Sequence, residues 1–302
     1  MAEHSGTRSG NPPAVAPGLP GLVLVSTPIG NLGDLSPRAL EAFRQADAVV
    51  CEDTRVTGGL LARHGVSVTL VPLHEHNEDA QVPALLDRLR QGQRVVLASD
   101  AGTPLVSDPG YRLVRAAIAA GLPVTAVPGP NAAVMALTLS GLPPDSFFFR
   151  GFLPQKAGPR AAELARLRVI ERAGLAATLI FFEAPHRLAE SLAAMADAFG
   201  PDRPAAVARE LTKRFEEVRR GTLGELAAHY AGHEARGEVT VVIGPALAEA
   251  PTDEAALDER LRAAMEAGLS LRDAAATVAT ATGLPRKQVY ARALDLARGA
   301  EK

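Results

Sequence analysis

A long loop in the first half of the chain carries the residues best suited to hold a ligand. The segment LASDAGTPLVSDPGYRL, residues 97–113, contains two Asp, two Gly and two Pro behind a short apolar run. An ordinary turn needs only a few such residues, whereas this loop runs for twelve, from Ser99 to Gly110. A loop of this length and composition indicates a segment that wraps around a bound molecule.

Two more loops rich in Gly and Pro each follow a predicted strand: STPIGN at residues 26–31 and PGPNAA at residues 128–133. Ligands of open α/β sheets bind beyond the carboxyl ends of the strands, so the three loops can converge on one crevice. Gly102 and Gly129 would let the backbone approach a ligand closely, and the nearby prolines would fix the shape of the loops. Ordinary turns would explain one or two of these loops, but three together favour a binding site.

Several familiar motifs are absent from the sequence. There is no P-loop, no G-x-G-x-x-G after the first apolar run, no Cys/His set at zinc spacing and no G-x-S-x-G elbow. The residues His74, Glu75 and His76 could ligate a metal, but adjacent polar residues at a strand end are more typical of a solvated or substrate-facing loop. We therefore expect no metal site.

The predicted strands and helices that must position these loops indicate an α/β fold. Apolar runs without polar alternation end at the loops, and predicted helices separate them, which is typical of a parallel sheet covered on both faces. One helix has a clear start, with Ser36 as N-cap and Pro37 at the first helical position. Asp108 is predicted to cap the helix that begins near Gly110.

The second half of the chain is less regular. Its predicted strands follow one another more closely, so we expect a mixed or antiparallel sheet. After Pro251 come Ala-rich helices, two of them separated by a turn with Gly283 and Pro285 in a helix-turn-helix outline. The expected organisation is a disordered tail at 1–20, α/β domains at 21–135 and 136–248, and a C-terminal helical extension at 252–302.

Composition narrows the classes of function. With 302 residues, 47% of them hydrophobic, the chain can build two cores. A formal net charge of −2 argues against binding nucleic acid through overall charge, but it leaves room for a local basic face. A single cysteine fits a reducing compartment, and no apolar run suits a signal peptide or a membrane span. We therefore expect a soluble cytoplasmic protein.

Six segments between residues 26 and 217 resemble the tetrapyrrole methylase superfamily of S-adenosylmethionine-dependent methyltransferases. They are STPIGNLGDLSPRA, CEDTR, SDAGTPLVSDPG, PGPNA, FFEAPHR and ARELTKRFEE. Within the superfamily they are most similar to the small-subunit ribosomal RNA 2′-O-ribose methyltransferases. A corrinoid methylase would show a GDP-like tripeptide where this chain has Gly102, Thr103 and Pro104, and would lack FFEAPHR and the helical extension.

The resemblance implies two α/β domains with S-adenosylmethionine in the cleft between them, usually in a homodimer. Thr103 stands where the wider family has Asp, which leaves the recognition of the cofactor's ribose or methionine part open. Carried over loop by loop, the implied cofactor contacts are Pro28, Asp100, Gly102, Thr103, Val106, Gly129, Asn131 and Ala132.

The activity implied is 2′-O-methylation of a cytidine in the decoding region of small-subunit (16S) rRNA, within the assembled 30S particle. A ribose hydroxyl is a very weak acid, so a base or a nearby cation should help to remove its proton. For each charged residue in the remaining motifs, a structural ion pair is an equally good explanation. The catalytic candidates are Glu183, Glu210 and Lys213. The candidates for RNA contact are Arg55, His186, Arg187, Arg209 and Arg214.

Two other functions stay open. A methylase of a corrin or porphyrin precursor would need an open apolar cleft, and a non-catalytic RNA-binding ribosome assembly factor would have no use for cofactor loops. The cluster ARELTKRFEEVRR and the basic C-terminal helix favour RNA.

Overall fold

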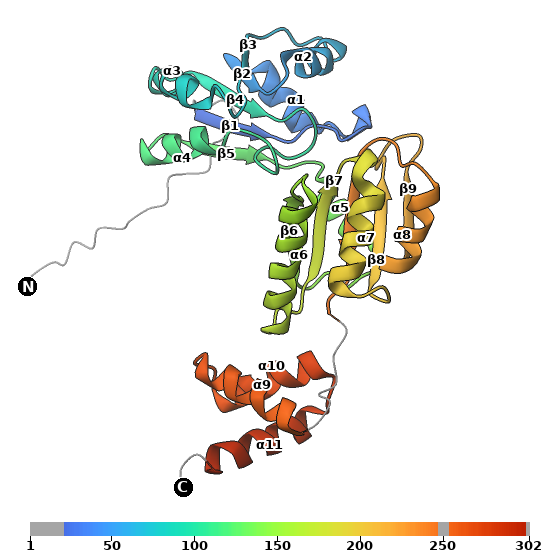
Figure 1. The fold of residues 1–302 in the computed structure, drawn as a ribbon. Helices are drawn as coiled ribbons and strands as arrows, with labels where there is room; N and C mark the ends of the chain where they lie inside the picture. The colour runs from blue at the N-terminus through green and yellow to red at the C-terminus, as the bar shows by residue number, and fades with distance from the viewer. Residues whose placement is uncertain (1–20, 247–253, 300–302) are drawn as a thin grey trace, which may run out of the picture. The chain divides into compact units, whose positions relative to one another are not determined.

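The computed structural model describes residues 21–246 and 254–299 (Figure 1). These residues form two compact units. Unit 1 contains the described residues up to Met135 together with Leu211–Arg214, and unit 2 contains Ala136–Glu210 and the described residues from Phe215 onward. The tail predicted at 1–20 lies outside the described residues, as does the stretch between the predicted second domain and the helical extension.

Unit 1 is built on a five-stranded parallel sheet, as predicted. Its strand order is β3-β2-β4-β1-β5, and every neighbouring pair is parallel. The strands are β1 Gly21–Val25, β2 Ala48–Cys51, β3 Leu70–Pro72, β4 Arg94–Ala98 and β5 Val124–Val127. The helices are η1 Leu32–Asp34, α1 Pro37–Arg44, α2 Thr54–Arg63, α3 Glu78–Arg90 and α4 Tyr111–Ala119.

The strands of unit 1 are mostly apolar because both faces of the sheet are covered. Leu22, Val95 and Leu97 pack with Leu85 and Leu89 of α3 and with Leu113 and Ala117 of α4 on one face. Successive residues of a strand point to opposite faces, so Val23, Val25 and Val96 pack with Ala39 and Phe43 of α1 and Leu61 of α2 on the other. The start of α1 is as predicted, since the amide of Ala39 donates to Ser36 Oγ over 3.1 Å and Pro37 opens the helix.

Unit 2 contains a mixed sheet of order β6-β7-β10-β8-β9, also as predicted. Only the β6/β7 pair is parallel, and the other three pairs are antiparallel. The strands are β6 Phe147–Phe152, β7 Thr178–Glu183, β8 Pro204–Arg209, β9 Glu217–Thr222 and β10 Val239–Ile243. The helices are α6 Ala157–Arg172, η2 Pro185–Arg187, α7 Leu188–Phe199 and α8 Leu223–Gly232, and α5 Ala132–Ser140 spans the division between the units.

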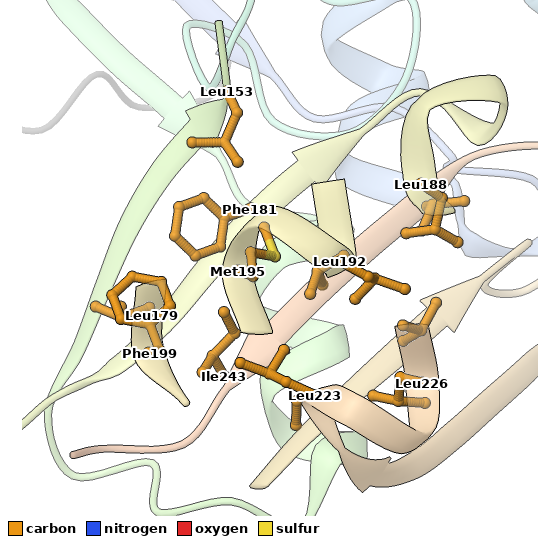
Figure 2. Close-up of a cluster of buried hydrophobic side chains, with 14 of the residues drawn as sticks. Leu153, Leu179, Phe181, Leu188, Leu192, Met195, Phe199, Leu223, Leu226 and Ile243 are labelled. Atoms are coloured by element: carbon orange, nitrogen blue, oxygen red, sulfur yellow. The ribbon is translucent and has the colours of Figure 1, made fainter. Parts of the chain in front are cut away.

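One apolar core holds the sheet of unit 2 to its helices. Figure 2 shows Leu179, Phe181 and Ile243 of the strands with Leu192 and Met195 of α7, all fully buried. Charged side chains are also buried in this unit. Glu171 of α6 pairs with Arg203, whose Nε donates to the carbonyl of Gly244 over 2.7 Å.

The C-terminal part of unit 2 is a group of three helices, α9 Glu254–Glu266, α10 Leu271–Thr282 and α11 Arg286–Gly299. They have a core of their own, which includes Leu257, Leu261, Val278, Val289 and Ala293. Gly283 ends α10 in a left-handed conformation with φ +68°, and α11 begins three residues later, so the predicted helix-turn-helix outline is present. Among the described residues, no helix is both long and apolar enough to cross a membrane.

Candidate functional site

The three Gly/Pro loops predicted from the sequence are joined to one another in unit 1. Thr27 and Gly102 form an isolated antiparallel bridge, in which each amide donates to the other's carbonyl, over 2.9 and 3.1 Å. The Thr27 hydroxyl donates to the carbonyl of Ser99, and the Ser99 hydroxyl donates to that of Gly102. The loops 26–31, 99–110 and 128–133 therefore form one loop cluster at the carboxyl ends of β1, β4 and β5.

Thr103 connects all three loops of this cluster. Its hydroxyl donates to the carbonyl of Pro130 over 3.1 Å and accepts from Asn131 Nδ2 over 3.2 Å, and it lies 3.4 Å from Ser26 Oγ. The Asn131 side chain also caps α5, because its Oδ1 accepts from the amide of Val134. Two predicted cofactor contacts therefore also fix the shape of the loop cluster.

The two predicted close-approach glycines make room for neighbouring loops. A Cβ at Gly129 would lie 2.8 Å from the Cβ of Ser26, closer than side-chain carbons approach in proteins. Gly102 has φ +85°, which disfavours other residues, and a Cβ there would lie 3.2 Å from Ile29 Cγ2. Glycine is thus required at both positions for the loops to meet.

Backbone strain is concentrated in the long loop. Leu105 and Ser107 both adopt left-handed conformations, with φ +72° and +68°, which cost a non-glycine residue free energy. The predicted helix cap at Asp108 is wrong. Gly110 occupies the N-cap position of α4, and the buried carboxylate of Glu78 accepts from the amides of Arg112 and Leu113 instead.

Asp108 instead lies among other acidic groups of the strand ends. Burial, together with the negative charges of Glu52 and Asp100, raises the pKa of Asp108 to about 6. Burial likewise raises the pKa of Glu52 and of Asp100, whose Oδ1 accepts from the amide of Asp53 over 3.1 Å. No ion pair of the described residues includes Glu52, Asp100 or Asp108, so this group of carboxylates can accommodate a positively charged ligand.

The tip of the β8–β9 hairpin belongs to unit 1, although both of its strands belong to unit 2. The chain enters the tip, Leu211–Arg214, through left-handed conformations at Glu210 and Thr212, with φ +52° and +66°. A Cβ at Gly30 would collide with the Cγ of Lys213 and would lie 3.0 Å from Thr212 Oγ1. The Lys213 side chain therefore lies against the first loop of the loop cluster.

The other two catalytic candidates are engaged inside unit 2. The buried Glu183 carboxylate accepts from Ser191 Oγ over 2.5 Å, from the amide of Ala184 over 2.8 Å and from the Arg187 guanidinium. The Glu210 carboxylate accepts from the amide of Glu238 over 3.2 Å, above Gly237, where a Cβ would collide with it. Of the three candidates, only Lys213 shares a unit with the loop cluster.

Of the five residues predicted to contact RNA, Arg55, His186 and Arg214 are exposed. Arg55, Arg187 and Arg209 each pair with a carboxylate, those of Asp53, Glu183 and Glu217. Sequence reasoning missed the cap formed by Glu78 and the assignment of Lys213 to unit 1. The only sequence feature that could have indicated the position of Lys213 is Gly30, because a glycine there leaves space for a long side chain.

Comparison with known proteins agrees with this architecture. The family described as tetrapyrrole (corrin/porphyrin) methylases matches residues 21–227, and the RsmI C-terminal HTH domain matches residues 251–297. The chain is 51% identical to ribosomal RNA small subunit methyltransferase I of Mesorhizobium japonicum, over 92% of each chain. It is 48% identical to the protein of the same name from Xylella fastidiosa, over 89% of this chain and 97% of that one.

Among solved structures, it is similar to uroporphyrin-III C-methyltransferase of Thermus thermophilus complexed with S-adenyl homocysteine. The TM-score is 0.51 at 22% identity, covering 74% of this chain and 97% of that one. The family match spans more than half of the sequence, and the identity to the relatives extends over nearly all of it. The chain therefore belongs to the tetrapyrrole methylase family, and its resemblance to that family through the six segments is confirmed.

Proposed function

We propose that this protein methylates the 2′-hydroxyl of a cytidine ribose in the decoding region of small-subunit rRNA, with S-adenosylmethionine as methyl donor. The observation that carries the proposal is the similarity to ribosomal RNA small subunit methyltransferases I along about nine-tenths of the chain, C-terminal helices included. The uroporphyrin methylase structure, in contrast, matches nearly all of its own chain but only 74% of this one. That difference favours RNA over a corrin or porphyrin precursor as the acceptor.

The residues of the loop cluster fit this cofactor. S-adenosylmethionine carries a positively charged sulfonium. Asp100 and Asp108 belong to the loop cluster, Glu52 interacts electrostatically with both, and none of the three carboxylates forms an ion pair among the described residues. Burial and, after it, repulsion from neighbouring carboxylates raise their pKa values, and a bound cation would favour their ionised forms. Backbone groups and small side chains of the loops would hold the rest of the molecule. We propose as its contacts the set expected from the sequence, namely Pro28, Asp100, Gly102, Thr103, Val106, Gly129, Asn131 and Ala132.

S-adenosylmethionine, when bound, would supply a methyl group that passes from its sulfur to the ribose oxygen, leaving S-adenosylhomocysteine, while the hydroxyl proton passes to solvent. The protein must align the acceptor oxygen and favour loss of that proton. Lys213 is the catalytic candidate that lies against the loop cluster. Its ammonium would stabilise the negative charge that develops on the ribose oxygen. Glu210 would position Lys213 by holding the strained turn that precedes it, and Glu183 would fix Arg187 and Ser191 within unit 2.

The proposed setting is the assembled 30S particle in the cytoplasm, with the enzyme as a homodimer. A net charge of −2 gives little general attraction to RNA, so folded rRNA must present much of the binding surface. Exposed His186 and Arg214 would contact the RNA directly. Arg55, Arg187 and Arg209 would contribute through the outer edges of their ion pairs.

The test is methyl transfer from radiolabelled S-adenosylmethionine to 30S particles that lack the modification, followed by nucleoside analysis. We expect label in 2′-O-methylcytidine. Cofactor binding without labelled RNA would redirect the search to corrin or porphyrin acceptors. Absence of cofactor binding, with RNA still bound, would favour a non-catalytic assembly factor.

A further inference from the structure

The second helix of the C-terminal helix-turn-helix presents cations and an aromatic ring to solvent. Arg286, Lys287 and Arg298 of α11 are exposed, and the Tyr290 side chain is 40% exposed. Spacings of three and four residues place Lys287 and Arg286 beside Tyr290 on the helix surface. None of the ion pairs found among the described residues includes Arg286 or Lys287.

The third arginine of the same helix, Arg292, has a structural role. Arg292 donates to both oxygens of Asp258 on α9, from Nε over 2.6 Å and from Nη2 over 2.8 Å. Its Nη1 also lies 3.7 Å from Glu254. The bidentate pair holds α11 against α9 on the side where Val289 and Ala293 are buried. Asp258 and Glu254 of α9 thus pair with Arg292, whereas Arg286 and Lys287 of α11 are exposed to solvent.

We propose that Arg286, Lys287 and Tyr290 form a docking surface for small-subunit rRNA, an inference that rests on the proposed methylation of that RNA. Charge complementarity identifies the partner, because the two unpaired cations suit phosphate groups. The exposed tyrosine ring between them suits the face of an unpaired base.

The surface docks on the outside of folded RNA and does not read a duplex. The major groove of A-form RNA is too deep and narrow for side chains to read, whereas phosphates and unpaired bases of loops are accessible. Two cations and one ring add affinity without sequence specificity. Choice of the target nucleotide therefore falls to the methylase domains, and the C-terminal helices increase the time spent on the particle.

The experiment uses the full chain with Arg286→Gln and Lys287→Gln combined, and Tyr290→Ala alone. The matched control is Arg44→Gln with Arg63→Gln. These two exposed arginines end α1 and α2, at the edge of the sheet opposite the loop cluster. Binding to 30S particles and to naked small-subunit rRNA is titrated between 50 and 200 mM salt, and KM and kcat of methyl transfer are measured alongside. Thermal unfolding checks that each variant is folded.

Loss of two phosphate contacts should weaken binding about 10- to 40-fold near 0.1 M salt. It should also make the negative slope of log K against log salt shallower, by about 1.4 to 1.8. Tyr290→Ala should weaken binding by roughly tenfold with an unchanged slope, and Tyr290→Phe should restore it. The variants should lower kcat/KM by raising KM for the RNA, with kcat unchanged. Their affinity for S-adenosylmethionine should equal that of the unaltered protein. The control pair should bind as the unaltered protein does.

Unchanged affinity and salt slope in the Arg286/Lys287 variant would overturn the docking surface while leaving methylation of rRNA intact. A loss seen with 30S particles but not with naked rRNA would assign the surface to a ribosomal protein instead, and would also overturn it. Failure of the unaltered protein to label RNA would count against the proposed function. The binding titrations would then still decide whether α11 contacts RNA.

Discussion

The carboxylates beside the strand ends have different surroundings in the two units. In unit 1, burial and repulsion from neighbouring carboxylates raise the pKa values of Glu52, Asp100 and Asp108, and no described ion pair neutralises them. In unit 2, the Arg209 guanidinium lowers the pKa of Glu217, and Arg187 lies against the buried Glu183. Partly desolvated carboxylates without a counter-charge cost stability, whereas paired ones hold elements together. The same residue types at the same kind of position therefore indicate a ligand in one unit and a scaffold in the other.

The largest effect expected from this contrast is a loss of stability in unit 2. Glu171→Ala should lower the free energy of unfolding by about 3–5 kcal/mol, because it leaves the buried Arg203 without a counter-charge. Burial raises the pKa of Glu171 and lowers that of Arg203 despite their pairing, so desolvation outweighs the attraction. Denaturant unfolding measures the change.

Two controls sharpen this first prediction. Asp87→Ala breaks an exposed pair with Arg90 and should change stability by less than about 0.5 kcal/mol. Replacing both buried partners, as Glu171→Leu with Arg203→Met, should recover most of the loss, since no charge is then stranded. If the double variant is as unstable as Glu171→Ala, the ion pair itself stabilises the fold, and the loss in Glu171→Ala does not come only from the unpaired charge of Arg203.

The second prediction concerns Lys213. Of the three catalytic candidates, it alone belongs to the same unit as the loop cluster. Lys213→Ala should lower kcat about 100-fold, equivalent to ~2.7 kcal/mol of transition-state stabilisation, because the developing oxyanion loses its cation. Single-turnover methyl transfer to 30S particles gives the rate. Lys213→Arg should retain part of it, and Lys156→Ala, at an exposed position before α6, should retain all of it. A comparable loss of kcat in Glu183→Gln, measured on folded protein, would break the division between catalytic and scaffold residues.

The third prediction tests how the loop cluster is held. Gly129→Ala should weaken S-adenosylmethionine binding roughly 10-fold, since the new methyl meets the Cβ of Ser26 and pushes two loops apart. Gly59→Ala on α2 is the matched control, because a Cβ there meets nothing within 4 Å and alanine favours a helix. Calorimetric titration of both variants with the cofactor decides the point. Equal affinities would mean that the loops can part without harming the site.

The parallel sheet, the mixed sheet and the helical hairpin could all be predicted because each follows from local patterns. A Ser-Pro pair such as Ser36 and Pro37 favours a helix start, with serine as N-cap and proline at the first helical position, and unbroken apolar runs such as β1 require cover on both faces. The convergence of the three loops could also be predicted, because parallel strands end at one edge of their sheet.

The roles of single charged residues could not be predicted in this way. Glu183 and Lys213 stand in equally suggestive motifs, but one is enclosed by Arg187 and Ser191 and the other lies against Gly30. The partners of Glu183 lie four and eight residues further along the chain, but the sequence does not show that its carboxylate is buried against them. The approach of Lys213 to Gly30 joins segments far apart in the sequence and depends on tertiary packing. The cap of α4 was missed for the same reason, since Glu78 reaches it from another helix.

The smallest expected effect lies in unit 1, at Asp108. Its pKa is about 6 in the folded protein against 3.8 as the ordinary value, so the folded state prefers the protonated carboxyl. Stability from this group is therefore present below pH 3.8 and is lost as the pH rises through about 6. Asp108→Asn removes the titration while keeping the shape. It should match the unaltered protein near pH 4 and be more stable by about 1 kcal/mol at pH 7.5, a value reduced because the carboxyl is partly solvated. A difference that does not vary with pH would mean that Glu52 or Asp100 carries the proton in place of Asp108. Saturating S-adenosylmethionine should narrow the difference, because its positive charge favours the ionised aspartate and has no such effect on asparagine.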